Sequence, residues 1–532
     1  MTSSDLPHSP APVSSSGALA GDSAEGLPAD LPRLVNSVIW PGFVGTTVPA
    51  WLDGALRNGL AGVVYFAHNI DPSVPEQVGA LSTAIRTANP AAVVGVDEEG
   101  GNVTRLQARD GSTIPGAAAL GALDELTTTA AAGRAIGRLC RAAGVNLTIA
   151  PVADVNTNPL NPVIGVRAFG SSTALVSAHT AAAVSGIQEL RVGACAKHFP
   201  GHGDTVTDSH MDVARVELTM AQMREHHLPP FQAAIDAGVA SMMSAHIIIP
   251  ELGETPATLN PQVGTLLREM GYEGLLITDA LDMAAVRATV GPGEGAVLAL
   301  LAGSDLLCVG NPLNAYTTGR DDEACYTEVY DAVYDAVSSG RLPVSVLRQA
   351  GARVATFAQW SQGAPTAAAD SSAEADAVID WVDVAARACK IAQGAAAVSG
   401  YLADLDAVVT LVDARTGHNM AAGPTENFLA TALLDEHQVS TLGAASLPAP
   451  ELSELLGADS SQGEPIIVIV DSLLSPEQQA TLALVAQAAP NAVCINAGLA
   501  PEAASTAGGL TTIHCHGFSR VGAEAVVRLL QA

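Results

Sequence analysis

The sequence predicts an α/β protein, with an N-terminal (β/α)8 TIM-type barrel followed by a smaller open α/β sandwich domain. First, short apolar runs rich in β-branched residues recur between 34 and 310, and segments with helical periodicity separate them. Second, acidic, basic or histidine residues follow several of these runs directly. Third, a stretch rich in Ser, Ala, Gly and Pro at 361–375 precedes a second series of strand and helix patterns.

The barrel prediction depends on the number of strand-like runs. Eight of them occur within about 280 residues, which fits a closed barrel better than an open doubly wound sheet. They lie at 37–43, 62–66, 92–97, 146–151, 193–199, 240–245, 274–279 and 306–309.

These patterns divide the chain into a barrel domain at 31–360 and a C-terminal α/β domain at 376–532. A helical stretch at 322–360, broken at 340–343, closes the barrel region, and 361–375 is interpreted as a linker. Residues 1–30 mix Ser, Pro, Ala and Gly with acidic residues, which is typical of a disordered leader.

The C-terminal domain shows strand patterns at 407–412, 465–470 and 492–495, which alternate with helical patterns at 476–488 and 520–530. It contains neither G-x-G-x-x-G nor G-x-x-x-x-G-K, so a nucleotide-binding role has little support.

Composition narrows the possible functions. The 532 residues include 24 basic and 54 acidic side chains, a formal net charge of −30, so nucleic acid and anionic membranes are not expected partners. No apolar run reaches the length of a membrane span. The N-terminus lacks a basic region before an apolar core, and the seven cysteines are odd in number and scattered, so we expect a cytoplasmic protein without a disulfide framework.

Polar residues follow five of the eight strand-like runs. In a (β/α)8 barrel, catalytic residues come from the C-terminal ends of the strands, so these groups are expected at one mouth. Each alone is equally explained as a helix N-cap, but all five together favour a site. They are Asp97 with Glu98 and Glu99, Asp154, Lys197 with His198, His246, and Asp279.

The segment 197–210 concentrates Lys, His and Asp residues, which can take part in catalysis, within a short stretch of the chain. Its Gly, Pro and His content predicts a long loop after a strand. Asp208 and His210 are two residues apart, close enough for the carboxylate to fix the imidazole tautomer and raise its pKa, which would make a proton donor and acceptor near neutral pH. The alternative is that Asp208 caps a turn and His210 is a solvated loop residue.

Asp279 ends a fully apolar strand, and a cation such as Lys197 or Arg167 could keep it ionised as a nucleophile. Asp282, three residues later, is interpreted as an acidic residue in the first turn of the next helix. Asp97 precedes a glycine pair and could accept two hydrogen bonds from vicinal hydroxyls, although acids before Gly-Gly also occur in ordinary turns.

Four segments together resemble glycoside hydrolase family 3, in particular its β-N-acetylhexosaminidase branch. The resemblance covers 34–360 and extends more weakly to 518–520. The segments are Lys197-His-Phe-Pro-Gly-His-Gly203 with Asp208-Ser-His210, Asp97 to Arg105, Asn161 to Gly170, and Thr278-Asp-Ala-Leu-Asp-Met283.

The resemblance implies a retaining mechanism in which Asp279 attacks the anomeric carbon, while His210, paired with Asp208, protonates the leaving oxygen. It implies no cofactor and no metal. It also implies that five residues bind the sugar, namely Asp97, Arg105, Arg167, Lys197 and His198.

The sequence departs from the family pattern at three positions. Asn102 stands where Arg is common, and Val166 and Ala168 flank Arg167 where Asp and Ser are common. None of them removes a proposed catalytic group, but the changed neighbours of Arg167 affect sugar selectivity.

The expected function is exo-acting release of GlcNAc from GlcNAc-terminated saccharides, for instance in peptidoglycan recycling. Phosphate as acceptor is the main alternative, because His210 would not repel an anion as a carboxylate would. An amino-sugar-binding protein without turnover is a further alternative, and a metal-dependent hydrolase another. The candidate metal ligands are His198, His202, Asp204, Asp208 and His210.

Overall fold

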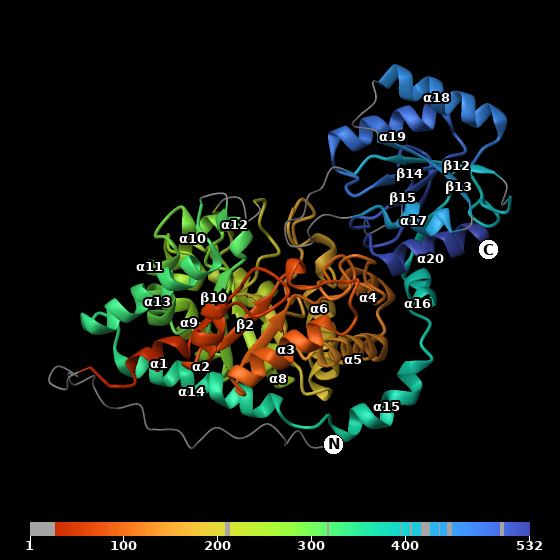
Figure 1. The fold of residues 1–532 in the computed structure, drawn as a ribbon. Coiled ribbons are helices and arrows are strands. Elements are labelled where there is room, and N and C mark those ends of the chain that lie inside the picture. The colour runs from red at the N-terminus through yellow and green to blue at the C-terminus, as the bar shows by residue number, and fades with distance from the viewer. Residues whose placement is uncertain are drawn as a thin grey trace.

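Eight parallel strands of the N-terminal unit curl around a common axis in the computed structural model (Figure 1). The structure describes residues 27–207, 213–316, 319–394, 396–404, 407–415, 426–435, 437–443, 449–500 and 505–532. The barrel strands are β1 (Ile39–Pro41), β2 (Gly62–Tyr65), β3 (Val93–Val96), β4 (Leu147–Thr148), β5 (Gly193–Phe199), β7 (Ser241–Ser244), β9 (Leu275–Thr278) and β10 (Leu307–Gly310). Each lies within or overlaps one of the predicted runs, so the predicted barrel is confirmed.

Backbone pairing joins these strands into a ring. Six form one sheet in the order β2-β3-β4-β5-β7-β9, and β1 pairs with β10. A parallel bridge between Ile277 and Leu306 links β9 to the start of β10. The N–H of Ala61 donates to the carbonyl of Asn36 at 2.9 Å, which links the entries of β2 and β1.

The barrel core is filled by apolar side chains from strands and helices. Trp40, Tyr65 and Phe199 are fully buried. Gly95 in β3 accommodates Trp40, because a Cβ at this position would lie 2.1 Å from the indole ring. A glycine is therefore required where the strand meets this ring.

Helices follow the strands and form the outer layer (Figure 1). Several begin at a side-chain N-cap; Ser172 and Asp321, for example, accept the N–H groups of Leu175 and Ala324. The barrel-region helices are α1 (Leu31–Asn36), α2 (Ala50–Arg57), α3 (Gln77–Ala88), α4 (Ala117–Leu123), α5 (Leu126–Ala142), α6 (Thr173–Glu189), α7 (Met220–Gln222), α8 (Pro229–Asp236), α9 (Pro261–Glu269), α10 (Ala284–Arg287), α11 (Pro292–Leu301), α12 (Pro312–Tyr316), α13 (Asp322–Ser338) and α14 (Val344–Ser361). Two short strands, β6 (Ala214–Arg215) and β8 (Ile247–Ile248), pair outside the barrel.

The segment 361–375, predicted as a linker, is partly helical. Helix α15 (Ala367–Ala377) occupies most of it, and Asp376 forms ion pairs with Arg134, at 2.7 Å, and with Arg138 of α5. Most of the predicted linker is therefore a helix that ion pairs hold to α5. The division into domains at 31–360 and 376–532 stays a prediction, and residues 1–26 of the predicted leader lie outside the described residues.

The C-terminal unit is a six-stranded sheet between two helical layers (Figure 1). Its strands are β11 (Lys390–Ala392), β12 (Val408–Asp413), β13 (Gln438–Gly443), β14 (Ile466–Val470), β15 (Val493–Asn496) and β16 (Thr511–His514), ordered β11-β16-β15-β14-β12-β13 with only β11 antiparallel. Helices α17 (Phe428–Leu434) and α20 (Arg520–Gln531) pack on one face, and α18 (Ala449–Gln462) and α19 (Pro476–Ala488) on the other. Helix α16 (Trp381–Ala388) packs against α20.

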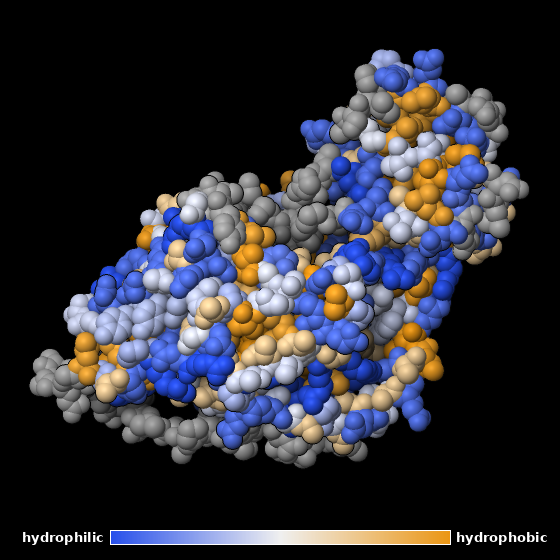
Figure 2. Space-filling view, in the orientation of Figure 1, coloured by the Kyte–Doolittle hydropathy of each residue, from blue (hydrophilic) through white to orange (hydrophobic). Residues whose placement is uncertain are grey.

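The predicted strands and helices of this unit are confirmed as β12, β14, β15, α19 and α20. Hydrophilic residues cover most of the face seen in Figure 2, with apolar patches on both units. Among the described helices, none combines the length and the apolar character that crossing a membrane requires.

Candidate active site

A cavity of about 1380 Å³, including its open mouth, lies at the carboxyl ends of the barrel strands. It is lined by six of the eight predicted site residues. The other two, Asp208 and His210, lie outside the described residues. The six are Asp97, Arg105, Arg167, Lys197, His198 and Asp279.

Three charged residues that line the cavity, Asp97, Arg167 and Lys197, form a cluster with Glu99. Lys197 Nζ lies 2.8 Å from Oδ1 of Asp97 and 2.6 Å from Oε1 of Glu99. Arg167 donates to both carboxylate oxygens of Glu99, at 2.7 and 3.0 Å. Glu99 therefore bridges the two cations that sequence reasoning assigned to sugar binding, a role that was not predicted for it.

Burial and charge oppose each other in this cluster. Burial alone would raise the pKa of Glu99, but the adjacent Arg167 and Lys197 hold that pKa well below its usual value. Burial would lower the pKa of Lys197, and its contacts with Asp97 and Glu99 raise it instead. Glu99, Arg167 and Lys197 thus keep their charges at neutral pH, with the donors fixed in place before any ligand binds.

Asp279 follows β9 directly and faces the same cavity. Its Oδ1 accepts the N–H of Ala280 at 2.8 Å, which fixes the side chain at the strand end. Lys197 and Arg167 line the same cavity, so both predicted cationic neighbours lie in the same site as the proposed nucleophile.

His198 is held by a carboxylate that lies behind the cavity. Nδ1 of His198 lies 2.7 Å from Oδ2 of the fully buried Asp154. Asp154 also accepts the N–H of His202 at 2.6 Å, so one acid fixes two points of the loop after β5. Sequence reasoning placed Asp154 at a strand end but gave it no role.

His202 also lines the cavity, beside His198. Burial lowers the pKa of His202 to about 4. Its imidazole is therefore neutral at physiological pH, and its carbonyl accepts from Nδ2 of Asn161 at 2.9 Å.

Arg105 is positioned through its backbone. Oε2 of the buried Glu98 accepts the N–H groups of Arg105 at 3.1 Å and Leu106 at 3.0 Å. Burial raises the pKa of Glu98 to about 7. Glu98 thus holds the backbone that carries a predicted sugar-binding side chain.

The prediction that Asp282 lies in the first turn of a helix is wrong. Helix α10 begins at Ala284, so Asp282 precedes the helix rather than lying in its first turn. Its Oδ2 accepts from Nδ2 of Asn314 at 2.8 Å, and both residues line the cavity.

Within the described ranges, no three His, Cys, Asp or Glu side chains come together as a metal site would require. Of the candidate ligands, His198 is paired with Asp154, and Asp204 accepts the hydroxyl of Thr157 at 2.7 Å. Asp208 and His210 lie outside those ranges.

The barrel and this cavity define an enzyme whose fixed donors and acceptors suit a ligand with many hydroxyl groups. Residues 52–357, more than half of the chain, match the profile of the glycosyl hydrolase family 3 N terminal domain. The chain therefore belongs to glycoside hydrolase family 3.

Two curated relatives carry the name beta-hexosaminidase. The protein from Stenotrophomonas maltophilia is 37% identical over 285 residues, which cover 51% of this chain and 82% of the relative. Beta-hexosaminidase A from Pseudoalteromonas piscicida is 32% identical over 58% of this chain, and the matched region spans 55% of that relative's length.

The similarity to solved structures extends over both units. A family 3 β-N-acetylglucosaminidase from Paenibacillus sp. aligns with a TM-score of 0.78 at 28% identity, covering 94% of this chain and 96% of the other. The C-terminal unit, to which sequence reasoning gave no site, therefore belongs to a two-unit architecture that this relative shares.

Proposed function

We propose that this protein is a retaining exo-β-N-acetylglucosaminidase that releases terminal GlcNAc through a covalent glycosyl-Asp279 intermediate. The observation that carries the proposal is the position of Asp279 at the end of β9, in one cavity with all five predicted sugar-binding residues. The names of the relatives support the choice of sugar.

In the first step, a carboxylate oxygen of Asp279 forms a bond to the anomeric carbon while the bond to the leaving oxygen breaks. His210, oriented by Asp208, gives its proton to that oxygen. In the second step, His210 takes a proton from water, whose oxygen replaces Asp279 on the sugar. The dyad lies outside the described residues, so its placement is part of the proposal.

The remaining residues hold the sugar. Asp97 accepts hydrogen bonds from sugar hydroxyls, while Lys197 and Arg167 donate to them from fixed positions. Because Glu99 already neutralises part of their charge, these cations suit neutral hydroxyl groups.

Phosphorolysis is the second candidate, in which phosphate replaces water and the product is a sugar 1-phosphate. Arg105, Arg167 and Lys197 line the cavity and supply N–H donors for the oxygens of a phosphate. A histidine acid/base would not repel phosphate.

One experiment separates the two reactions. Turnover of an aryl β-N-acetylglucosaminide is measured with and without millimolar phosphate, and the sugar product is identified by mass spectrometry. Free N-acetylglucosamine in both samples supports hydrolysis, whereas a phosphate-dependent rise in sugar 1-phosphate supports phosphorolysis. No turnover in either sample would overturn both and leave a binding protein or another sugar.

A cytoplasmic location and a role in peptidoglycan recycling complete the proposal. All seven cysteines are free thiols, which suits a reducing compartment. Cell fractionation and turnover of muropeptides that carry terminal GlcNAc are the corresponding tests.

A further inference from the structure

A loop of the C-terminal unit contacts the segment that carries two charged residues of the sugar cavity, Asp97 and Arg105. We call residues 515–519 the Gly517 loop and residues 97–105 the Asn102 segment. The N–H of Phe518 donates to Oδ1 of Asn102 at 2.7 Å, across 416 residues of sequence. Asn102 lies between Glu99 and Arg105, at one of the positions where this sequence departs from the family pattern.

Three contacts fix the Gly517 loop and the start of the helix that follows it. The guanidinium of Arg415 lies 3.9 Å from the centre of the Phe518 ring. Ser519 caps α20 by accepting the N–H of Gly522. The N–H of Val521 donates to the carbonyl of Ser112 at 3.2 Å, so the C-terminal unit contacts the barrel loop at a second point.

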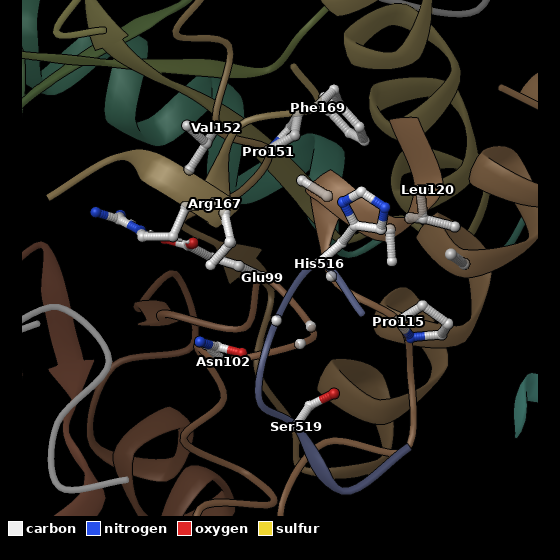
Figure 3. A pocket seen from close by; sticks show the side chains of 18 of the residues that line it. Glu99, Asn102, Pro115, Leu120, Pro151, Val152, Arg167, Phe169, His516 and Ser519 are labelled. Carbon is white, nitrogen blue, oxygen red and sulfur yellow. Dashed lines mark hydrogen bonds and ion pairs between the residues drawn. The ribbon is translucent and has the colours of Figure 1, made fainter. Parts of the chain in front are cut away.

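A second cavity lies between these two segments (Figure 3). Glu99 and Arg167 line it from the barrel side, and His516 and Ser519 line it from the C-terminal unit. His516 is only 6% exposed, and its Nε2, within the described part of the chain, has no hydrogen-bond partner.

Arg167 lines both the sugar cavity and this interdomain space, and its ion-pair partner Glu99 lines the interdomain space. On the barrel side, the N–H of Gly101 donates to the carbonyl of Ile114 at 2.9 Å, and the N–H of Arg105 donates to Oε2 of Glu98 at 3.1 Å. On the side that borders this cavity, the Asn102 segment is held by directed contacts from the C-terminal unit. The hydrogen bond from Phe518 to Asn102 is such a contact.

We propose that Asn102 is a positioning residue through which the C-terminal unit sets the geometry of the sugar-binding residues. Its amide oxygen anchors the Asn102 segment, and the segment places Asp97 and Arg105 in the sugar cavity and Glu99 against Arg167 and Lys197. The C-terminal unit thus takes part in sugar binding without touching the sugar. The proposal rests on the function proposed above.

The test compares three variants by steady-state kinetics on the aryl β-N-acetylglucosaminide. Asn102→Leu keeps the size of the side chain and removes the acceptor, whereas Asn102→Asp keeps an acceptor oxygen. Arg387→Ala breaks a different contact between the units, the ion pair with Glu125. Thermal unfolding confirms that each variant is folded.

We expect Asn102→Leu to raise KM about tenfold with kcat changed less than about twofold, because contacts to sugar hydroxyls are made in the bound ground state as well as in the transition state. Asn102→Asp should restore most of the lost affinity, and Arg387→Ala should leave KM unchanged. A folded Asn102→Leu protein with wild-type KM would overturn the proposal, as would an equal rise in KM for Arg387→Ala. An inactive wild-type protein would instead overturn the proposed function.

Discussion

The carboxylate of Asp154 lies 2.7 Å from Nδ1 of His198, and this contact determines which imidazole nitrogen is available to the cavity. Because Nδ1 is paired with the carboxylate, Nε2 remains for the ligand. The same acid accepts the backbone N–H groups of His198 and His202, so side chain and loop are fixed together.

Asp154→Asn should lower kcat/KM at least about tenfold, because the amide no longer stabilises the required tautomer of His198. The measurement is turnover of the aryl substrate, with thermal unfolding as the check on folding. Asp204→Asn, which changes a carboxylate that accepts the hydroxyl of Thr157, is the matched control and should stay close to wild type. Equal activity of both variants would contradict an orienting role for Asp154.

Glu99→Gln should lower the free energy of unfolding by about 3 kcal/mol, because it leaves two buried cations without their shared counter-charge. Urea unfolding measures the change. Glu294→Gln breaks the exposed pair with Arg341 and should cost less than about 1 kcal/mol. A loss at Glu99 no larger than this control would show that the cluster adds little to stability.

Because of the buried carboxyl of Glu98, we expect the free energy of unfolding to depend on pH. Burial raises the pKa of Glu98 from 4.5 to about 7 because it disfavours the charged carboxylate. The neutral carboxyl therefore contributes fully to the free energy of unfolding below pH 4.5, and this contribution is lost as the pH rises through about 7. Glu98→Gln stays neutral, so the stability of the wild type relative to this variant should fall by about 3 kcal/mol between pH 4.5 and 8. Denaturant unfolding across this range measures the difference.

The control for Glu98 is Glu273→Gln, at an exposed position. Its stability relative to the wild type should be nearly constant over the same pH range. If the Glu98→Gln difference is equally flat, the buried carboxyl does not titrate as expected.

Asp279→Asn should reduce turnover at least about a thousandfold, since the amide has the same shape but is not an effective nucleophile. Mass spectrometry of the denatured protein, after reaction with a slow fluorinated glycosyl fluoride of N-acetylglucosamine, should find a sugar adduct on the wild type only. Substantial activity of the folded variant would contradict the assigned nucleophile.

Most barrel strands were predictable because a strand buried on both faces is a continuous apolar run, as in Val93–Val96. β13 was missed because its residues are exposed or half-buried, so it carries no such run. Helix α15 was missed because its Ala, Ser and Asp composition resembles a linker, and ion pairs with Arg134 and Arg138 bind it to the barrel.

The site was predictable to the extent that barrel geometry places strand ends together. Asp97, Lys197 and Asp279 follow from that rule and meet in one cavity. The partners of each group were not predictable. Glu99 and Arg167 are 68 residues apart, and only the folded loops determine that Glu99 rather than Asp97 bridges the two cations.

The position of Arg167 at both cavities has a consequence for redesign of the enzyme. Arg167 lines both the sugar cavity and the interdomain space, so a shorter side chain at this position would open a path between the two volumes instead of only enlarging one. An Arg167 variant meant to accept bulkier sugars would then admit solvent from the domain junction. Changes to substrate range are better directed to residues that line the sugar cavity alone, such as His68 and Asn314.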